Sequence, residues 1–462
     1  MHIIGSMVGS GARSGHLALV ERSGGALAVD RRSFLKTAAG VAGYSLALPT
    51  FVQRILPRGD NAFLDDLGQR SFRYFWEQSD PFTGLTRDRS ANGRHLEEHR
   101  NVASIAATGF GLAALCVGAD RGWVEPDEAA NRVLNTLDFF ANHAPNERGW
   151  FYHCMDMRTG ERSGFSAGST RKSELSSMDT ALLLGGVLAA KQQFSGDAGI
   201  ARMADAIYQR VDFRWMLNGN PMLLSHGWTP ERGFIRYRWD NYCEHTLLYL
   251  LGIASPTSRL DADSWYAWNR PETNYDGGSY IGKAPLFTHQ FSHAFIDYRN
   301  RREDRGTRTN WFENSVAATR VQRKFCLDIS GEFPGYSDRI WGVTSSDSAK
   351  GYVAWGGPPS LFAIDGTVVP CAAGGSLMFT PDICVPALRA MHDRFGEKIY
   401  GRYGFVDAFH PTNGWVGRDH IGIDVGISLL AAENLRSGNV WKWFMANPEV
   451  QRGMERAGLS AA

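Results

Sequence analysis

The chain has 462 residues, enough to bury a large core in two or three domains or in one large barrel or toroid. Its 49 basic and 48 acidic residues give a formal net charge of +1, so no overall electrostatic field favours binding to nucleic acid or to an anionic membrane. Six scattered cysteines without CxxC spacing argue against a zinc knuckle or a dense disulfide scaffold. Aromatic residues make up 12% of the chain, which makes stacking on a ligand worth testing.

The N-terminal region resembles a twin-arginine export signal. The pattern RRSFLK at 31–36 precedes a modest apolar run at 37–52, which is too short and too rich in Ala and Gly for a membrane span. The alternative is a chance Arg pair before an ordinary apolar segment. We interpret residues 1–57 as an export signal and leader, and 58–462 as one domain that is exported already folded to the periplasm or beyond.

Helical periodicity dominates the rest of the chain. The spacing of apolar residues predicts helices at 61–79, 102–117, 125–142, 177–193, 201–217, from Tyr242 onward, and at 285–299, 311–327, 382–395, 422–436 and 449–457. Strand alternation is scarce, and long loops rich in Gly, Trp, Asp and Tyr separate the helices. About a dozen helices with acidic loops at one end predict a mainly α fold, an (α/α)6 toroid formed by two rings of helices.

The stretch 225–252 combines aromatic, basic and acidic residues with a helix start. Its first half suits a polar ligand with flat apolar faces, such as a sugar, through Trp228, Phe234, Arg236, Tyr237, Arg238 and Trp239. Asp240 and Glu244 are four residues apart, which would place them on one face of the first turn of the helix. Such acids are often only helix caps, so the stretch alone leaves catalysis and capping both open.

Further carboxylates accompany helix starts and loops. They are Glu174, Asp179, Asp407, Asp424 and Glu433. Glycoside cleavage needs a protonated acid at the leaving oxygen and a second carboxylate across the bond, so a pair from this set would serve. Most acidic side chains are solvated or cap helices, and Ser176 with Asp179 could simply cap the helix that follows.

A metal site is one interpretation of a histidine pattern in the second half of the chain. His289, His293 and Asp297 follow one another at intervals of four, a spacing compatible with metal ligands. The segment is also rich in Phe, which favours histidines that are satisfied in the core or in a sugar subsite. We therefore expect no metal and no cofactor.

Several ordered motifs from about Phe63 to the C-terminus resemble the glucoamylase-like family, which is similar to or includes the bacterial endo-β-1,2-glucanases of glycoside hydrolase family 144. The motifs are FLDDLGQRSFRYFWEQSDPFTGLTRDRS, ASIAATGFGLAAL, SSMDTALLLGG, RWDNYCEHTLLYLLGIASPTS, PLFTHQFSHAFIDYR, WGVTSSDSAKGY, IDGTVVPCAAGGS and YGFVDAFHPTNGW. The resemblance implies an (α/α)6 toroid that binds a β-glucan and inverts the anomeric centre with a general acid and a general base.

Carried onto this sequence, the WDxYxE motif implies that Glu244 is the acid. The base would be Asp424 or Asp407, and Glu174 would orient substrate or water. We expect substrate contacts by Glu174, Asp179, Trp228, Arg238, Trp239, Asp240, Tyr242, His289, His293, Trp341, Tyr352 and Trp415. Val425 and His410 stand where the resemblance leads us to expect Gln and Asn, so chain-length preference and linkage stay open beside the proposed base.

The expected partner is an oligo- or polysaccharide bound by a monomer, without nucleic acid and without stable membrane insertion. Two alternatives stay open. A polysaccharide lyase on a similar toroid would use a Tyr or His base, for which His153, His226 and Tyr237 are candidates. A glucan-binding protein without catalysis would keep the aromatic residues but need no functional acid pair.

Overall fold

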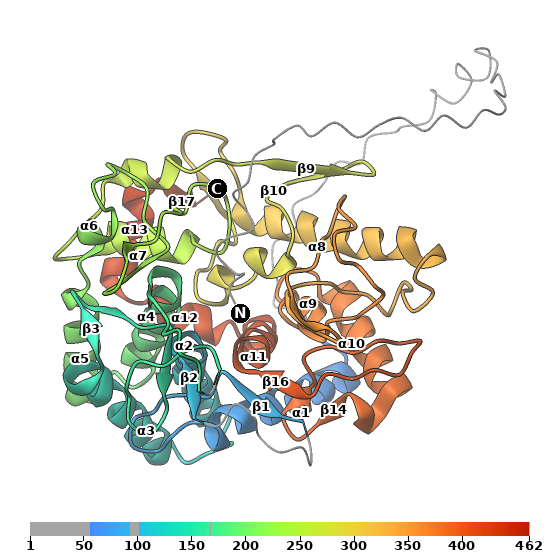
Figure 1. The fold of residues 1–462 in the computed structure, drawn as a ribbon, viewed down its shortest axis with the longest axis horizontal. Coiled ribbons are helices and arrows are strands. Elements are labelled where there is room, and N and C mark those ends of the chain that lie inside the picture. Colours follow the sequence, from blue (N-terminus) through green and yellow to red (C-terminus); the bar gives the residue numbers. More distant parts are fainter. Residues whose placement is uncertain (1–55, 93–100, 167, 462) are drawn as a thin grey trace. The chain divides into compact units, whose positions relative to one another are not determined.

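The computed structural model describes residues 56–92, 101–166 and 168–461 (Figure 1). The twin-arginine segment lies outside the described residues, so the export signal stays a prediction. The described chain is mainly helical, as predicted. Its α-helices are α1 (Arg58–Glu77), α2 (Ile105–Asp120), α3 (Pro126–Asp138), α4 (Ser177–Gln193), α5 (Ala198–Arg210), α6 (Phe213–Met216), α7 (Thr246–Ala254), α8 (Trp311–Asp328), α9 (Pro370–Gly374), α10 (Pro381–Phe395), α11 (Gly422–Arg436), α12 (Asn439–Met445) and α13 (Pro448–Arg456).

Strands are short, and in the described residues they form only small antiparallel sheets. One sheet has three strands, in the order β6 (Leu175–Ser176), β7 (Gly227–Thr229) and β8 (Gly233–Phe234). The other sheets are pairs: β1 (Arg89–Ala91) with β16 (Asp419–Ile421), β2 (Val102–Ser104) with β5 (Cys154–Asp156), β3 (Asn146–Glu147) with β4 (Trp150–Phe151), β9 (Glu272–Tyr275) with β10 (Gly278–Ile281), β11 (Arg301–Glu303) with β17 (Leu459–Ala461), β12 (Ser346–Ser348) with β13 (Gly351–Val353), and β14 (Tyr400–Gly401) with β15 (Gly404–Phe405).

Two predicted helices are interrupted. The segment 201–217 divides into α5 and α6, since Asp212 leaves helical geometry and caps α6 by accepting from the Trp215 N–H. The segment 285–299 is wrong as a continuous helix and contains only the short 3-10 turns η3 (Leu286–His289) and η4 (Ser292–Ala294). Tertiary hydrogen bonds hold this segment, because the Gln290 amide donates to the Ala372 carbonyl at 2.9 Å and the Ser292 hydroxyl accepts from the Leu247 N–H at 2.9 Å.

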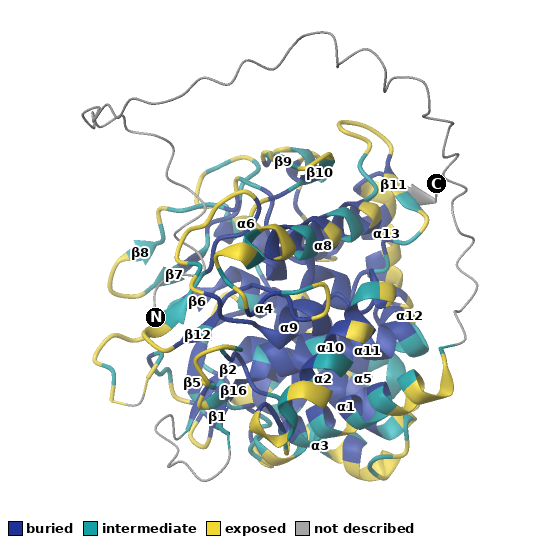
Figure 2. Cartoon of the chain, turned by 90° about the vertical axis from the view of Figure 1, so that its right-hand side faces the viewer, coloured by how far each residue is buried: buried dark blue, intermediate teal, exposed yellow. Residues whose placement is uncertain are grey.

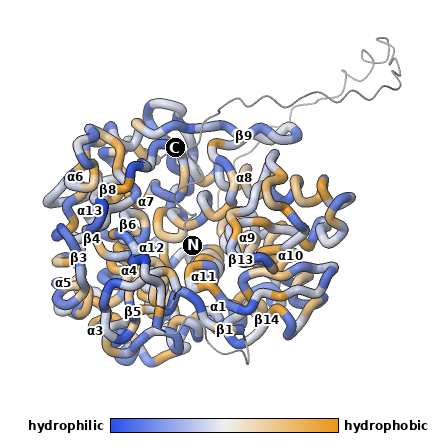
Figure 3. The backbone as a smooth tube through the Cα atoms, viewed as in Figure 1, coloured by the Kyte–Doolittle hydropathy of each residue, from blue (hydrophilic) through white to orange (hydrophobic). Residues whose placement is uncertain are grey.

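Five helices are buried on nearly every side: α2, α4, α7, α9 and α11. Figure 2 shows α2 and α11 in the deeply buried region, and Figure 3 shows hydrophobic residues gathered around α9 and α11. Glycines let α2 and α4 touch through their backbones. A Cβ added to Gly109 would lie 2.3 Å from the Leu182 carbonyl oxygen, and one added to Gly186 would lie 2.0 Å from the Gly109 carbonyl oxygen.

Short strands lead directly into three of these buried helices. β2 precedes α2, β6 precedes α4, and β16 precedes α11. The side chains of Ser104 and Ser176 cap the first two helices by accepting from the Ala107 and Asp179 N–H groups. Figure 2 shows these strands gathered on one side of the helices, so the N-terminal ends of α2, α4 and α11 face the same side. Within the described residues, no helix is long and apolar enough to span a membrane.

Candidate active site

A cavity of about 960 Å³ lies at the N-terminal ends of the buried helices. α2 contributes Ala106, α4 contributes Met178 and Asp179, and α11 contributes Ile423. Helix N-termini present unpaired backbone N–H groups and a positive dipole end, which favour oxygen-rich ligands and anionic side chains. Concave sites with apolar walls and a few convergent polar groups are typical of small-molecule binding.

Glu244 reaches this cavity from the turn that precedes α7. α7 begins only at Thr246, so the predicted placement of Glu244 in the first helical turn is wrong. Asp240 is exposed whereas Glu244 is only 2% exposed, so the two acids do not share a face. Burial raises the pKa of Glu244 to about 7, against an opposing hydrogen bond from the Cys243 thiol. Glu244 is therefore a carboxyl that can hold a proton near neutral pH.

A second group of titratable side chains lines the same cavity. The Nδ1 atom of His153 lies 3.1 Å from Glu174 Oε1 and 3.4 Å from Asp179 Oδ2. Although burial alone would lower the pKa of His153, the two carboxylates raise it to about 9. The pKa of Glu174 is lowered by His153 in spite of burial, whereas burial keeps that of Asp179 raised. An imidazolium bridging two acids thus sits near the candidate general acid.

Asp424 and Asp407 form a buried carboxyl pair next to the main cavity. Asp424 lies in the first turn of α11, and Asp407 accepts from the Asp347 N–H at 2.6 Å. Burial raises the pKa of Asp424 to about 6 and, together with the charge of Asp424, raises that of Asp407 well above its usual range. Two neighbouring buried carboxyls resist ionising together, so the pair holds one proton near neutral pH.

This pair lines a small hollow of about 20 Å³ rather than the main cavity. Ile421 belongs to both linings, which makes the two spaces neighbours. Tyr352 lines the main cavity and also interacts with the carboxyl pair. Burial and the charge of Asp424 together raise the pKa of the Tyr352 hydroxyl. The carboxyl pair therefore lies beside the part of the main cavity that Ile421 lines.

One wall of the cavity is aromatic. His226 stacks on Trp239 with ring centroids 4.0 Å apart, and the Trp239 indole donates to the Ser177 hydroxyl at 2.8 Å. Burial lowers the pKa of His226 to about 4, so this ring is neutral at pH 7. Phe165 and Tyr237 complete a surface suited to the apolar faces of sugar rings.

Comparisons with known proteins agree with this geometry. Residues 236–448 match the family Glycoamylase, described as putative glucoamylase. An endo-β-1,2-glucanase structure from Chitinophaga pinensis, in complex with sophorotriose and glucose, superposes with a TM-score of 0.80 at 27% identity, covering 87% of this chain and 98% of that one. The resemblance to the glucoamylase-like family is confirmed.

Parabacteroides distasonis supplies both a similar sequence and a similar solved structure. An exo β-1,2-glucooligosaccharide sophorohydrolase is 27% identical over 434 residues, or 87% of this chain. The chain spans 58% of the length of that relative. A β-1,2-glucanase structure has a TM-score of 0.79 at 26% identity, with 87% of this chain and 60% of that chain covered.

The structure brings part of the predicted site together. The cavity lining contains Glu244, Glu174, Asp179, Trp239 and Tyr352. Sequence reasoning did not single out Asp88, which lines the cavity immediately before β1, and it considered His153 only as a lyase base. The motif ending in GLTRDRS contains Asp88 and was the available signal, but a single acid in a polar loop carries no spacing that marks it.

Other predicted substrate contacts lie outside the cavity lining. Arg238 donates to the carbonyl oxygens of Leu217 and Leu223 at 2.7 Å each, so it stabilises the loop between these two residues. Trp228 packs on Trp215 with centroids 5.7 Å apart, and Asp240 is exposed. Glu433, which was a candidate acid, instead pairs with Arg121 at 2.9 Å.

The aromatic and histidine candidates of the second half are packed in the core. The ring of Tyr242 stacks on Trp311 with centroids 4.9 Å apart, and its hydroxyl lies 3.3 Å from Nδ1 of His289. Nε2 of His293 lies 3.1 Å from the Ser315 hydroxyl, and Trp341 is fully buried. Trp415 lies in a turn, where its carbonyl accepts from the His410 N–H. None of these five lines the cavity in the described part of the chain. Nor does that part contain a group of three or more His, Cys, Asp or Glu residues placed to hold a metal ion.

Proposed function

We propose that this protein is a glycoside hydrolase that cleaves β-1,2-linked glucan by an inverting acid and base mechanism. The observation that carries the proposal is the buried carboxyl of Glu244, which has a pKa near 7 and lines a cavity large enough for several sugar rings. The names of the related β-1,2-glucanases and of the sophorohydrolase support the linkage.

The chemistry follows from the protonation states near neutral pH. Protonated Glu244 donates its proton to the glycosidic oxygen as that bond breaks. An ionised carboxylate takes a proton from the attacking water on the opposite face of the sugar ring. Asp424 is the favoured base, because its pKa near 6 leaves it ionised while the more strongly raised pKa of Asp407 leaves that carboxyl protonated.

Separate Asn substitutions will distinguish the members of the carboxyl pair. Asp424→Asn will lower kcat by about 10²- to 10⁴-fold, the usual contribution of a general base. Asp407→Asn will keep more turnover and will leave the acid limb of the rate profile near pH 6, because the Asn amide can replace the hydrogen bond by which protonated Asp407 lowers the pKa of Asp424. Steady-state kinetics across pH makes the test, and the opposite pattern would assign the base to Asp407.

The wild-type rate should depend on pH in a bell shape. As pH rises through about 7, Glu244 loses the proton that it must donate, so kcat/KM falls. As pH falls through about 6, Asp424 becomes protonated and can no longer accept a proton, so kcat/KM falls again. A profile that stays flat between pH 6 and pH 9 would contradict this assignment of acid and base.

We also infer that the helices form an (α/α)6 toroid. The ring of inner elements would be α2, α4, α7, the η3 and η4 segment, α9 and α11. Packing of α2 on α4 and α11, of α4 on α7, and of α9 on α11 supports this arrangement, as do the hydrogen bonds from Gln290 and to Ser292 that link the 3-10 segment to α9 and α7. The half-buried helices α1, α3, α5, α8, α10 and α13 would form the outer ring.

A substrate panel tests the proposed reaction. The purified protein is incubated with linear β-1,2-, β-1,3-, β-1,4- and α-1,4-glucans and with uronic-acid polymers, and release of reducing ends is measured together with absorbance at the wavelength of unsaturated sugars. Hydrolysis of the β-1,2-glucan alone, without ultraviolet absorbance, is the expected result. Cleavage of uronic-acid polymers with an unsaturated product would contradict it and would support a lyase, although protonated His153 is poorly suited to accept a proton.

A further inference from the structure

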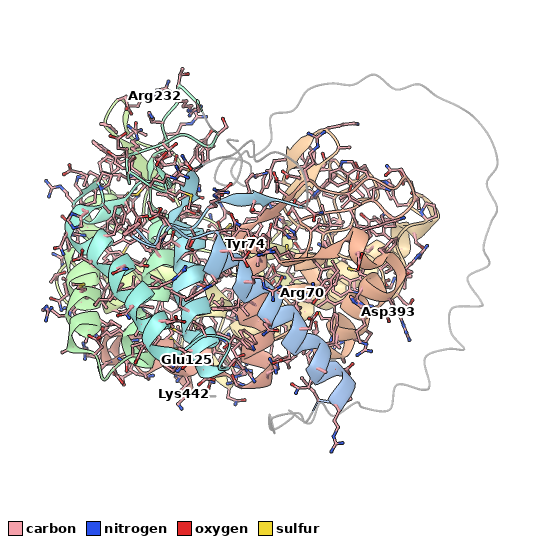
Figure 4. All side chains as sticks on the ribbon, turned by 90° about the horizontal axis from the view of Figure 1, so that it is seen from below. Arg70, Tyr74, Glu125, Arg232, Asp393 and Lys442 are labelled. Atoms are coloured by element: carbon pink, nitrogen blue, oxygen red, sulfur yellow. The ribbon has the colours of Figure 1, made fainter. Side chains whose placement is uncertain are left out.

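The outer part of the cavity carries a concentration of positive charge that acid and base chemistry does not use. The residues Arg171, Lys172, Arg232 and Arg236 all line the cavity and all are exposed. The first two follow one another before β6, and the other two flank β8, a strand of the same small sheet. We call these four residues the basic rim. Figure 4 shows Arg232 at the outer end of the loops, on the opposite side from Glu125 and Lys442.

Nearby acids offset the charge of the basic rim only through space, since Arg171 acts on Glu174 and Arg232 acts on Glu231 without a salt bridge. In the described chain, no residue of the rim has an ion pair within 4.0 Å, and the one exposed acid in the lining is Glu231. Glu231 is already held by Arg162, whose guanidinium donates to both carboxylate oxygens at 2.6 and 3.1 Å. The guanidinium of Arg236 rests 4.7 Å from the centre of the Tyr237 ring, which orients it but leaves its charge.

Charge is therefore divided along the cavity. Buried or half-buried positions in the lining carry the acids Asp88, Glu174, Asp179 and Glu244, whereas the basic rim is positively charged and exposed to solvent. An unsubstituted glucan is neutral and gains little from four like charges that repel one another at its entrance. Arg side chains are well matched to carboxylate and phosphate groups, with which they form paired, charge-assisted hydrogen bonds.

We propose that the basic rim binds anionic substituents, of carboxylate or phosphate ester type, on the sugar units of the glucan outside the cleavage site. This inference rests on the proposed function, since it adds a charged class of substrate to the same cavity. It makes the protein a hydrolase that prefers a glucan bearing negative charge over the neutral polymer.

Matched substrates test the proposal. Linear β-1,2-glucan is esterified either with succinate half-esters, which are anionic, or with butyrate, which has the same number of carbons and no charge. A phosphorylated glucan forms a third arm. We expect kcat/KM to favour the succinylated over the butyrylated glucan by about tenfold at low salt, since each exposed charge contact contributes a factor of roughly 1.5 to 5. The preference should disappear at about 1 M salt, where the Debye length is about 3 Å.

Variants locate the effect in the rim. The double variant Arg232→Gln with Arg236→Gln should reduce the preference by about threefold or more, and the double Lys variant at the same positions should restore most of it. Arg452→Gln, on the exposed face of α13, is the matched control and should leave the preference unchanged. A wild-type ratio near one, or a ratio unaffected by the Gln double variant, would overturn the proposal.

Failure of the reaction itself gives a different result. If the wild-type protein cleaves neither ester nor the unsubstituted glucan, the proposed hydrolase function fails. Calorimetric titration with the succinylated and butyrylated oligosaccharides then tests the rim alone. Tighter, salt-sensitive binding of the succinylated form supports the rim, whereas equal binding of the two esters contradicts it.

Discussion

Replacing Glu244 with Gln will reduce kcat on β-1,2-glucan by about 10²- to 10⁴-fold, the usual contribution of a general acid. The amide keeps the size of the side chain but cannot supply a proton to the leaving oxygen. Because Glu244 is buried and predominantly neutral below pH 7, the exchange should preserve the fold and the binding of oligosaccharides. Turnover is followed by reducing-end release, and binding by calorimetry with the inactive variant.

The pH profile gives a second signature of Glu244. The alkaline limb near pH 7 should vanish from the residual activity of Glu244→Gln, because the group that titrates there is gone. Glu455→Gln, at an exposed position in α13, is the control and should keep both kcat and the limb. Turnover within a few-fold of the wild-type value in Glu244→Gln would remove Glu244 from the role of acid.

Replacing His153 with Gln will lower the free energy of unfolding by about 3 kcal/mol near pH 6, the magnitude expected for a pKa raised by roughly two units between two buried carboxylates. The loss leaves Glu174 and Asp179 facing each other without a cation. Because the pKa of His153 is higher in the folded than in the unfolded state, its stabilising effect is full below about 6.5 and is lost as pH rises through about 9.

Urea unfolding at pH 6 and above pH 9 measures this dependence. The difference between wild type and His153→Gln should be large at the lower pH and should shrink at the higher one. His143→Gln is the control, since the side chain of His143 is 65% exposed beside Asp138. A His153→Gln penalty that does not change across this range would mean that packing of the ring, rather than its charge, stabilises the cluster.

Helix boundaries were predictable where local signals agreed. The predicted range of α4 is the observed one, because Ser176 caps an uninterrupted apolar run, and the range of α11 also agrees. Periodicity failed at 285–299 because Gln290 and Ser292 form hydrogen bonds with other helices, which no local pattern reveals. Periodicity also placed Glu244 wrongly in the first turn of a helix, because α7 begins only at Thr246 and the preceding turn places the carboxyl of Glu244 in the cavity.

Membership of the cavity was predictable where a motif pointed to a residue, and not where composition alone suggested sugar binding. Glu244, Glu174 and Asp179 meet in one cavity although up to 70 positions separate them in the sequence. Tyr242 and Trp341 also belong to motifs for which we expected sugar contacts, yet both side chains pack in the core. Aromatic residues serve cores and sugar sites alike, so only the folded arrangement separates the two uses.

The most direct test of the proposed reaction is a proton NMR time course of β-1,2-glucan hydrolysis by the purified protein. An inverting enzyme releases the α-anomer first, and the β-anomer appears only by mutarotation. We expect early α-anomer signals on short β-1,2-linked products, and we expect these signals to be lost in Glu244→Gln. Initial release of the β-anomer would contradict the inverting mechanism, and the absence of any product would contradict the proposed hydrolysis.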